Sequence, residues 1–484
     1  MRPCTKTGLF ATVLAALLAG CASSLPVAAP ARQATVRAAT DRPNIILILA
    51  DDLGYGDLGA FGQTRIATPH LDRMAAEGLR LTQFYTGAPV CAPSRAVLMT
   101  GQHTGHAAVR GNASNDIQQL RRTDETVADV LHRAGYRTAL FGKWGLGDAE
   151  TTSQPGDHGF DEFYGFLNQS HAHNHYPDFL WDGRHRDPLP NVVVSRGLSA
   201  SGFPVGAARP EDRKVFADDL FRSRALGFIA QNVDQPFFLF LSSILPHANN
   251  EANVVGTHGM EIGSYGRCAD ETWPDTAKGY AAMVSHLDET VGMVMAQVRD
   301  LGIADNTIVI FTSDNGPHAE GGNDPAFLNS SGPLRGIKRD VYEGGVRAPT
   351  IVWGAGLVGP GHTSNLLGYF GDFLPTVAEL AGVRAGPTDG ISLAPLLRGQ
   401  AGEQLQHDHL YWEFYERGGW QAVRAGRWKA VRQPMLTGPI QLYDVEADIS
   451  ETQDVAKDHP DVVSRMHAIM EREHVNDPNW RVIE

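Results

Sequence analysis

The sequence predicts an open α/β sheet covered by helices on both faces, followed by a smaller α+β lobe. Short apolar runs alternate with amphipathic helical stretches from Pro43 onward, and this is the pattern of a sheet buried between helices. After about residue 386 the pattern changes to short strands that alternate between apolar and polar residues. A chain of 484 residues also exceeds the usual size of a single core, which favours one large domain and a smaller one.

The elements of the large sheet follow from runs of apolar residues without polar interruption. Such runs are typical of parallel strands that are buried on both faces. Helical periodicity separates them. The predicted strands are Asn44–Asp51, Arg137–Gly142, Pro236–Ile244, Thr307–Ser313 and Pro349–Gly354, and the predicted helices are His70–Leu79, Thr126–Ala134, Asp218–Asn232 and Ala277–Leu301.

The C-terminal lobe follows from three segments that alternate in the manner of antiparallel strands. These are HLYWEF, WQAVRAGRWKAVR and IQLYDV, and a helical pattern over Pro460–Glu471 closes the lobe. We therefore expect a catalytic domain over residues 43–385 and a C-terminal subdomain over residues 386–484.

The first 20 residues predict a secretory signal. MRPCTKTGLFATVLAALLAGC begins with basic residues and continues with an apolar run that is too short to cross a bilayer. Leu18–Cys21 resembles a bacterial lipobox, which implies lipidation of Cys21; an ordinary signal cut near Ala22 is the alternative. Residues 21–42 are rich in Ala, Pro and Ser, as in a flexible tether. We expect an exported protein, anchored by lipid alone to the periplasmic face of the outer membrane or the cell surface.

Charge and cysteine content narrow the function further. A formal net charge of −14 argues against nucleic-acid binding, which needs a basic footprint, but it permits an anionic small substrate in a locally positive pocket. Of four cysteines, only Cys91 and Cys268 fall in the folded part. Export would permit a disulfide between them, although one pair in so long a chain is weak support for it.

Polar residues follow four of the predicted strands at their carboxyl ends, where open α/β sheets bind ligands. Asp51, Asp52, Asp314 and Asn315 form an all-oxygen set, which suits Ca²⁺ or Mg²⁺. The alternative is a helix cap at the Asp pair and a turn at Asp314-Asn315.

Four cationic or titratable side chains accompany these oxygen ligands: Arg95, Lys143, His247 and Lys338. Each could be an ordinary surface or structural residue. If they converge with a divalent metal, they would bind a tetrahedral oxyanion and stabilise the charge on its leaving oxygen.

The stretch CAPSRAVLMTG, Cys91 to Gly101, resembles the signature of the formylglycine-dependent sulfatases, which are arylsulfatase-like members of the alkaline phosphatase superfamily. IILILADDLGYGD, FGKWGLG, ILPHA, TSDNGPH, RGIKRDVYEGGVRAP and LYDVEADISET resemble other blocks of that family, in the same order. The resemblance implies an alkaline-phosphatase-like core. It also implies hydrolysis of sulfate monoesters, which in an exported bacterial protein are most plausibly those of sulfated carbohydrates.

The resemblance also implies roles for individual residues. A dedicated maturation enzyme would oxidise Cys91 to formylglycine, whose hydrate attacks sulfur and then expels sulfate as the aldehyde reforms. Asp51, Asp52, Asp314, Asn315 and the residue at 91 would hold one Ca²⁺. Arg95 would position the hydrate. Lys143 and Lys338 would bind sulfate oxygens, and His247 would give a proton to the leaving group.

One position departs from the family pattern. Many members have histidine after the Lys-Trp pair, where this chain has Gly145. His171, His173 and His175 alternate, so we expect them to lie on one side of an extended segment, where a neighbour could take over the role of the family histidine in handling the hydrate. We expect His171, His173 and His318 to bind substrate, and the loop from His103 to Asn112 is a further pocket candidate. A loop whose imidazoles cap backbone groups is the alternative, and three such histidines also resemble a transition-metal ligand set.

Two other functions remain open from the sequence. One is a phosphate or phosphonate monoester hydrolase on the same fold. The other is a non-catalytic lipoprotein that binds sulfated glycans, against which the complete set of charged residues argues.

Overall fold

The computed structural model describes residues 42–112, 118–198, 204–354 and 361–481. The predicted signal, Cys21 and nearly all of the predicted tether lie outside these residues. Among the helices within them, none is both long and apolar enough to span a bilayer.

A ten-stranded sheet forms the centre of the catalytic part, in the order β13-β2-β12-β11-β1-β10-β4-β5-β6-β7. Its four central strands are all parallel neighbours and confirm four of the predicted strands. Their carboxyl ends therefore meet at one edge of the sheet. These strands are β11 (Thr307–Ser313), β1 (Asn44–Ala50), β10 (Phe237–Ser242) and β4 (Arg137–Lys143).

The fifth predicted strand, β12 (Thr350–Gly354), is present but runs antiparallel to β11, so the expectation of a parallel strand was wrong. A strand buried on both faces is apolar in either direction, and its composition does not reveal its orientation.

The remaining strands of this mixed sheet are β2 (Leu79–Leu81), β5 (Glu162–Phe166), β6 (Phe179–Asp182), β7 (His185–Pro188) and β13 (His362–Ser364). Two small pairs lie outside it: β3 (Phe84–Tyr85) with β14 (Gly368–Tyr369), and β8 (Val193–Leu198) with β9 (Pro204–Ala208).

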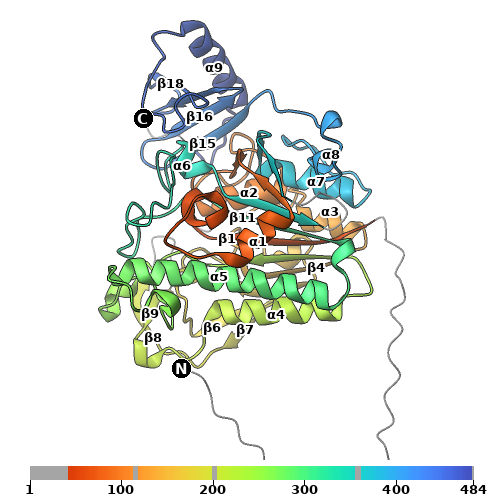
Figure 1. The fold of residues 1–484 in the computed structure, drawn as a ribbon, viewed down its shortest axis with the longest axis vertical. Helices are drawn as coiled ribbons and strands as arrows, with labels where there is room; N and C mark the ends of the chain where they lie inside the picture. Colours follow the sequence, from red (N-terminus) through yellow and green to blue (C-terminus); the bar gives the residue numbers. More distant parts are fainter. Residues whose placement is uncertain (1–41, 113–117, 199–203, 355–360, 482–484) are drawn as a thin grey trace, which may run out of the picture. The chain divides into compact units, whose positions relative to one another are not determined.

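Helices cover both faces of the large sheet, as predicted (Figure 1). On one face α2, α3 and α7 pack against Ile45 and Leu47 of β1, and on the other α1, α4 and α5 pack against Ile46 and Ile48. The four predicted helices are confirmed as α1 (Pro69–Glu77), α3 (Val127–Arg133), α4 (Ala217–Gln231) and α5 (Asp275–Asp300), and the others here are α2 (Cys91–Thr100), α6 (Glu343–Val346), α7 (Phe373–Leu380) and α8 (Ala394–Leu397).

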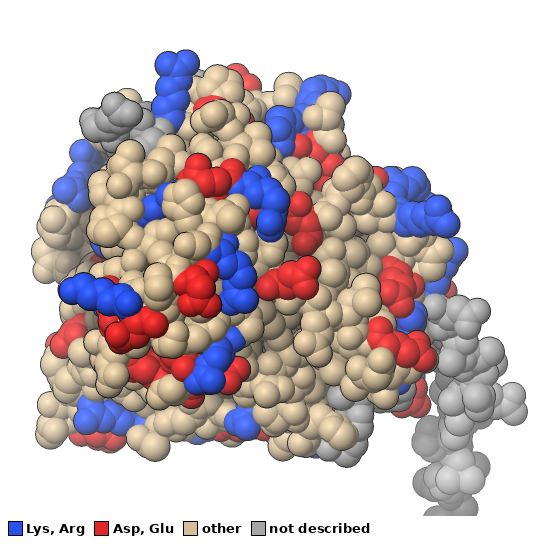
Figure 2. Space-filling view, turned by 90° about the horizontal axis from the view of Figure 1, so that it is seen from above, with Lys and Arg blue, Asp and Glu red and all other residues tan. Residues whose placement is uncertain are grey.

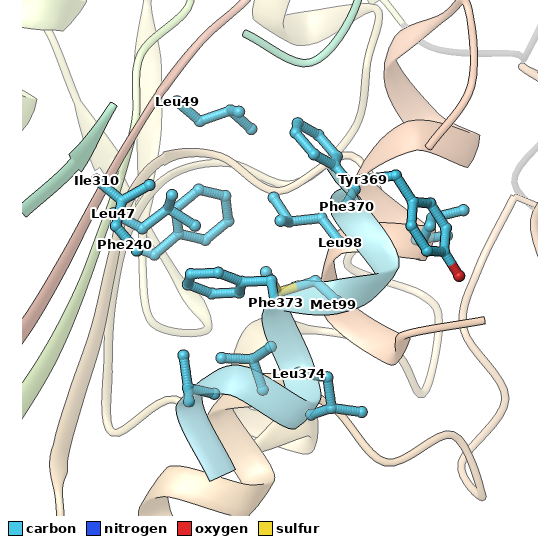
Figure 3. Close-up of a cluster of buried hydrophobic side chains, with 14 of the residues drawn as sticks. Leu47, Leu49, Leu98, Met99, Phe240, Ile310, Tyr369, Phe370, Phe373 and Leu374 are labelled. Atoms are coloured by element: carbon cyan, nitrogen blue, oxygen red, sulfur yellow. The ribbon is translucent and has the colours of Figure 1, made fainter. Parts of the chain in front are cut away.

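The core beneath α2 matters most for the site. Leu47 and Phe240, from two neighbouring strands, lie with Leu98 of α2 and Phe373 of α7 in one cluster of buried side chains (Figure 3). Burying each such side chain contributes about 1.5–3 kcal/mol. This packing fixes the position of α2, whose first residue is Cys91.

The C-terminal lobe has the predicted α+β structure. Strands β15 (Leu410–Phe414), β16 (Trp420–Ala425), β17 (Trp428–Arg432) and β18 (Ile440–Asp444) form an antiparallel sheet, and α9 (Pro460–Glu473) packs on it. Trp412 of β15 donates an indole hydrogen bond of 2.9 Å to the Thr86 carbonyl, and buried Lys429 of β17 lies 2.9 Å from Glu343. These contacts join the lobe to the catalytic part.

The acidic side chains do not form one continuous patch on the face seen in Figure 2. Acidic and basic side chains lie close together there, with apolar and uncharged residues between them. That face therefore carries no broad basic footprint of the kind that nucleic acids need.

Candidate active site

The shared edge of the four parallel strands brings the predicted polar residues together. Asp51 and Asp52 follow β1, Asp314 and Asn315 follow β11, and Lys143 is the last residue of β4. The side chains of all five are buried. Charged groups are rarely buried unless they are paired, so this cluster is built for ligand binding or ion pairing.

Cys91 enters the same edge from above the sheet, as the first residue of α2. Its Sγ atom lies 3.4 Å from Oδ1 of Asp51 and 3.9 Å from Oδ1 of Asp52. Cys268 is also a free thiol, and it belongs to the core on the opposite face of the sheet. A disulfide between the two is therefore excluded in this structure.

Arg95 lies one helical turn after Cys91 and on the same face of α2. Its Nε donates a hydrogen bond of 2.9 Å to Oδ2 of Asp314, and its Nη1 donates to the Lys143 carbonyl at 2.9 Å and to Oγ of Ser242 at 2.6 Å. The guanidinium thus ties the start of α2 to the ends of three strands.

Two lysines pair with the two adjacent aspartates. Nζ of Lys143 lies 2.6 Å from Oδ2 of Asp51, and Nζ of Lys338 lies 2.8 Å from Oδ2 of Asp52. Lys338 also lies 3.1 Å from Nε2 of His247. The cations therefore stand next to the carboxylates, within reach of any anion that binds beside them.

The carboxylates and lysines stabilise each other's charged forms. Burial alone would raise the pKa of Asp51, but Lys143 lowers it below its usual value. Burial would likewise raise the pKa of Asp52, and Lys338 lowers it. Both lysines, despite burial, have raised pKa values because of these carboxylates. These two aspartates and two lysines are therefore charged at neutral pH.

Three other groups have pKa values shifted toward their neutral forms. Burial, and then the charge of Asp51, raises the pKa of the Cys91 thiol well above its usual value. The same two causes raise the pKa of Asp314 to about 7. Burial, and then Lys338, lowers the pKa of His247.

The oxygen donors at this edge fit a hard cation. The carboxylate oxygens of Asp51 and Asp52 lie within 4.8 Å of each other, and the Cys91 thiol and an imidazole nitrogen of His247 lie within the same distance. Oδ1 of Asn315 is buried and lacks a hydrogen-bond partner among the described residues, while its amide nitrogen donates to Asp52 at 2.7 Å. A buried carbonyl oxygen without a partner is costly, and a cation bound between it and the carboxylates would satisfy it.

The segment with three histidines differs from the prediction. His171–His173 forms a 3-10 helix rather than an extended strand, so the three imidazoles do not line up on one side. His171 packs between Phe166 and Phe179, and Nε2 of His175 lies 2.9 Å from the His247 carbonyl. No transition-metal set forms from them among the described residues.

The other two predicted substrate-binding histidines lie next to His247. His173 stacks on it at 5.1 Å between ring centroids, and Nδ1 of His173 lies 3.1 Å from Oε2 of Glu251. His318 is fully buried, with Nε2 at 3.0 Å from the Pro246 carbonyl and Nδ1 accepting from the backbone of residue 320. Both ring nitrogens of His318 are thus engaged with backbone groups.

The side chains of the loop from His103 to Asn112 contact two different parts of the protein. The amide oxygen of Asn112 accepts a hydrogen bond of 3.3 Å from the backbone of Ala92, at the start of α2. His103 and Arg110 point instead to the C-terminal lobe, where they contact Glu473 and Glu413. Their role in the pocket stays a prediction, since sequence spacing does not show which side of a loop faces the site.

Gly145 takes the place of the family histidine, and its backbone lies in the left-handed region that favours glycine. Its φ is +76°, and a Cβ atom would lie 2.3 Å from Nε2 of Gln169. The amides of Gln118 and Gln169 both donate to the Gly145 carbonyl, at 3.1 and 3.4 Å. Glutamine amides therefore occupy the space beside this position.

Sequence reasoning missed Glu320. Its Oε2 lies 2.9 Å from Nζ of Lys338 and 3.7 Å from Nε2 of His247, and its other oxygen pairs with Arg339. Arg339 in turn pairs with Glu416 of the C-terminal lobe at 3.0 Å. The only signal was its position two residues after His318 in a glycine-rich stretch, which is typical of many loops.

Comparisons with known proteins agree with the geometry. Residues 43–383 match the protein-family model described as Sulfatase, and residues 337–476 match that described as N-sulphoglucosamine sulphohydrolase, C-terminal. Arylsulfatase A of Bos taurus is 35% identical over 397 residues, covering 78% of this chain and 72% of that protein. N-acetylgalactosamine-6-sulfatase of Sus scrofa is 34% identical over 390 residues, covering 76% of this chain and 69% of that protein. Among solved structures, that of Ps i-CgsB in complex with k-i-k-neocarrahexaose matches with a TM-score of 0.75 and 27% identity, covering 91% of this chain and 95% of that one.

Proposed function

This chain belongs to the sulfatase family of sulfuric ester hydrolases, and we propose that it cleaves sulfate esters of carbohydrates with a formylglycine made from Cys91 and one bound Ca²⁺. The observation that carries the proposal is the position of Cys91, which faces the Asp51-Asp52 pair at the edge where Lys143 and Lys338 also lie.

The donor set supports a calcium ion. Asp51, Asp52, Asp314 and the unpartnered amide oxygen of Asn315 would hold it, together with an oxygen of the modified residue 91. When bound, Ca²⁺ supplies a Lewis acid for a sulfate oxygen and for the attacking hydroxyl. All-oxygen ligation favours this ion over zinc at this edge.

The remaining residues act by holding charge and position. Lys143 and Lys338 flank the carboxylate pair, so their ammonium groups can bind sulfate oxygens on two sides. Arg95 holds the start of α2, and with it residue 91, against the strand ends. A nucleophile fixed in this way needs little reorganisation to reach the sulfur.

His247 and Lys338 form the pair that would deliver a proton to the leaving alcohol. Nδ1 of His247 lies 2.7 Å from the Ala248 carbonyl, which only accepts hydrogen bonds, so Nδ1 carries a proton. Nε2 therefore faces Lys338 as the working nitrogen. The Lys338 ammonium donates a hydrogen bond to Nε2 in this contact, and the pair can supply a proton to the leaving oxygen as negative charge builds on it.

The formylglycine explains why a cysteine stands here at all. A hydrated aldehyde has two hydroxyls on one carbon, so after one has attacked sulfur the other can lose its proton and expel the sulfate. An unmodified buried thiol lacks this exit. The proposal therefore requires a maturation enzyme that recognises the CAPSR segment before the chain folds, because Cys91 is buried in the folded protein.

Relatives that act on sulfated sugars support carbohydrate as the substrate class. One is named for N-acetylgalactosamine-6-sulfate, and one structural neighbour was solved with a neocarrahexaose. His173, whose side chain is 19% exposed and which stacks on His247, is the histidine best placed to contact the sugar. His171 lies in a cavity of about 400 Å³ with Phe179 and Trp181, and Cys91 is not part of the lining of that cavity.

The test of the proposed function is turnover of defined substrates. We expect hydrolysis of sulfated mono- and disaccharides, and of phenyl sulfate much faster than phenyl phosphate. A preference for phenyl phosphate would favour the phosphatase alternative. Absence of turnover with every sulfate ester, in protein shown to carry the aldehyde, would leave the glycan-binding alternative.

We also propose export and lipid anchoring through Cys21. The support is the sequence alone: a basic start, a short apolar run and the Leu18–Cys21 lipobox. A lipid chain contributes about 0.8 kcal/mol per buried CH₂ to membrane binding. Cys21→Ala should move the protein from the membrane fraction to the soluble fraction, and a wild-type protein found wholly soluble would contradict the anchor.

A further inference from the structure

His173 is the exposed end of a stack of three imidazole rings that begins inside the active site. The His247 ring lies between the other two, with its centroid 5.1 Å from that of His173 and 6.0 Å from that of His318. His318 is fully buried and the His247 side chain is 4% exposed, whereas the His173 side chain is 19% exposed. Because His247 is assigned to the leaving alcohol, the next ring outward lies beside the remainder of that alcohol.

A buried carboxylate fixes the orientation of the His173 ring. Nδ1 of His173 lies 3.1 Å from Oε2 of Glu251, whose side chain is 10% exposed. An ionised carboxylate only accepts hydrogen bonds, so Nδ1 carries the proton. Nε2 has no hydrogen-bond partner among the described residues. In its neutral form the ring therefore presents a free acceptor at Nε2.

A second buried network holds Glu251 in place. The amide oxygen of Asn249 accepts a hydrogen bond of 3.0 Å from the Glu251 backbone, and the amide nitrogen donates to Oε2 of Glu261 at 2.8 Å. Glu261 in turn pairs with Arg213 at 2.6 Å. Asn249 is fully buried and lies two residues after His247, so one amide fixes the loop that carries both His247 and Glu251. Such outer contacts are what hold a binding residue in one geometry.

We propose that His173, oriented by Glu251, accepts a hydrogen bond from a free hydroxyl on the carbon next to the sulfate ester. The inference rests on the proposed function, since it needs a sulfate ester bound beside His247. Sugar sulfates carry such hydroxyls, and aryl and simple alkyl sulfates do not. A site built to bond a hydroxyl discriminates against analogues that lack it, because its polar group is then left unpaired. His173 is the residue that contacts the substrate, and Glu251 is a positioning residue.

The test measures how much a neighbouring hydroxyl accelerates hydrolysis. The probes are the sulfate monoester of trans-cyclohexane-1,2-diol and cyclohexyl sulfate, which differ only in that hydroxyl, with phenyl sulfate as a check of general activity. In full-length wild-type protein that carries the formylglycine, we expect kcat/KM to be about tenfold higher for the diol ester, the equivalent of one hydrogen bond. His173→Phe keeps a ring in the stack without an acceptor nitrogen, so the two alkyl esters should then react at nearly equal rates.

Glu251 is tested by removal and by rescue. Glu251→Ala frees the His173 ring to rotate and to change tautomer, so the preference for the diol ester should fall as it does in His173→Phe. Glu251→Gln keeps an acceptor oxygen for Nδ1 and should restore most of the preference. A purely structural role would instead lower the turnover of all three probes in proportion.

His409→Phe is the matched control. Nε2 of His409 also lies 3.1 Å from a glutamate oxygen, that of Glu473, and its side chain is likewise 19% exposed, but the pair lies in the C-terminal lobe. The preference for the diol ester should be unchanged in this variant.

Three results would overturn the inference. One is a wild-type protein that hydrolyses phenyl sulfate but shows no preference for the diol ester. Another is a preference that survives in His173→Phe. The third is an equal fall for both alkyl esters in His173→Phe with phenyl sulfate unchanged, which would assign the ring to proton delivery through His247. A wild-type protein with formylglycine that leaves phenyl sulfate intact would contradict the proposed function itself.

Discussion

The Sγ atom of Cys91 lies 3.4 Å from Oδ1 of Asp51, so the first residue of α2 touches the residue that follows β1. The helix is held there by its packed core and by Arg95, which reaches the ends of β4, β10 and β11. Any group made from the Cys91 side chain is therefore fixed beside the buried carboxylates.

The first prediction concerns the metal. Asp52→Ala and Asp314→Ala each remove a carboxylate oxygen from the proposed calcium site. Asp314→Ala also leaves Arg95 without the partner that lies 2.8 Å away. We expect the loss of bound calcium together with a fall in kcat of at least 10²–10³, the range for losing one electrostatic contribution to catalysis.

Calcium is measured by plasma mass spectrometry and activity with an aryl sulfate. Glu77→Gln is the control, since Glu77 is the half-buried last residue of α1, pairs with Arg73 and Arg299, and is not among the proposed calcium ligands. Full activity in metal-free protein would show that the site does not use a cation.

The second prediction concerns Lys143. Its ammonium is buried and lies 2.6 Å from Asp51. Lys143→Ala therefore removes a positive charge that water does not easily replace at a buried position. We expect kcat to fall by about 10²–10³ with a smaller change in KM, because the charge acts chiefly on the leaving oxygen. Lys457→Ala, at an exposed position, should be unchanged. A rise in KM alone would assign Lys143 to binding only.

The third prediction concerns Glu320, which pairs with Lys338 as Asp52 does. Glu320→Gln keeps the shape of the side chain but removes the negative charge that, together with Asp52, pairs with Lys338. We expect kcat to fall about tenfold, the equivalent of one charge-assisted hydrogen bond of about 1.4 kcal/mol.

Glu416→Gln is the matched control for Glu320. Glu416 pairs with Arg339, which also contacts Glu320, but within the described part of the chain it forms no ion pair with Lys338. An equal loss of activity in both variants would show that the activity depends on the ion pairs of Arg339 and not on the position of Lys338.

The sequence predicted the strands and most of the site because buried strands and polar strand ends leave clear local patterns. It did not predict the direction of β12, because burial on both faces gives the same composition in either direction. The arrangement of His171 and His173 depends on one 3-10 turn. The contact of Glu320 with Lys338 depends on how the fold brings the two residues together. Neither leaves a signal in the residues themselves.

The fourth prediction concerns the joint between the catalytic part and the C-terminal lobe. Lys429 and Glu343 are both fully buried, and Arg347 also pairs with Glu343 at 3.2 Å. Lys429→Met leaves part of the Glu343 charge uncompensated, so we expect the free energy of unfolding to fall by about 3–5 kcal/mol. The double variant with Glu343→Gln should recover much of that loss in chemical denaturation. No recovery would show that Lys429 acts through packing rather than charge.

The same pair predicts a pH dependence of stability. Burial would raise the pKa of Glu343, but Lys429 and Arg347 lower it to about 2. A carboxyl group whose pKa is lower in the folded state stabilises the fold above its ordinary pKa and ceases to do so as pH falls through the folded value. Wild-type protein should therefore lose stability between roughly pH 4.5 and 2. The double variant should lose less over this range.

The most direct measurement is the mass of the tryptic peptide that contains residue 91, taken from active enzyme. If Cys91 is converted to formylglycine, that peptide weighs about 18 Da less than its sequence requires and reacts with hydrazides, because a carbonyl oxygen replaces the thiol and one hydrogen. The peptide with Cys268 should carry an unmodified thiol, and Cys91→Ala should fold and bind Ca²⁺ but lose turnover. Fully active enzyme in which Cys91 keeps the mass of an unmodified thiol would contradict the account.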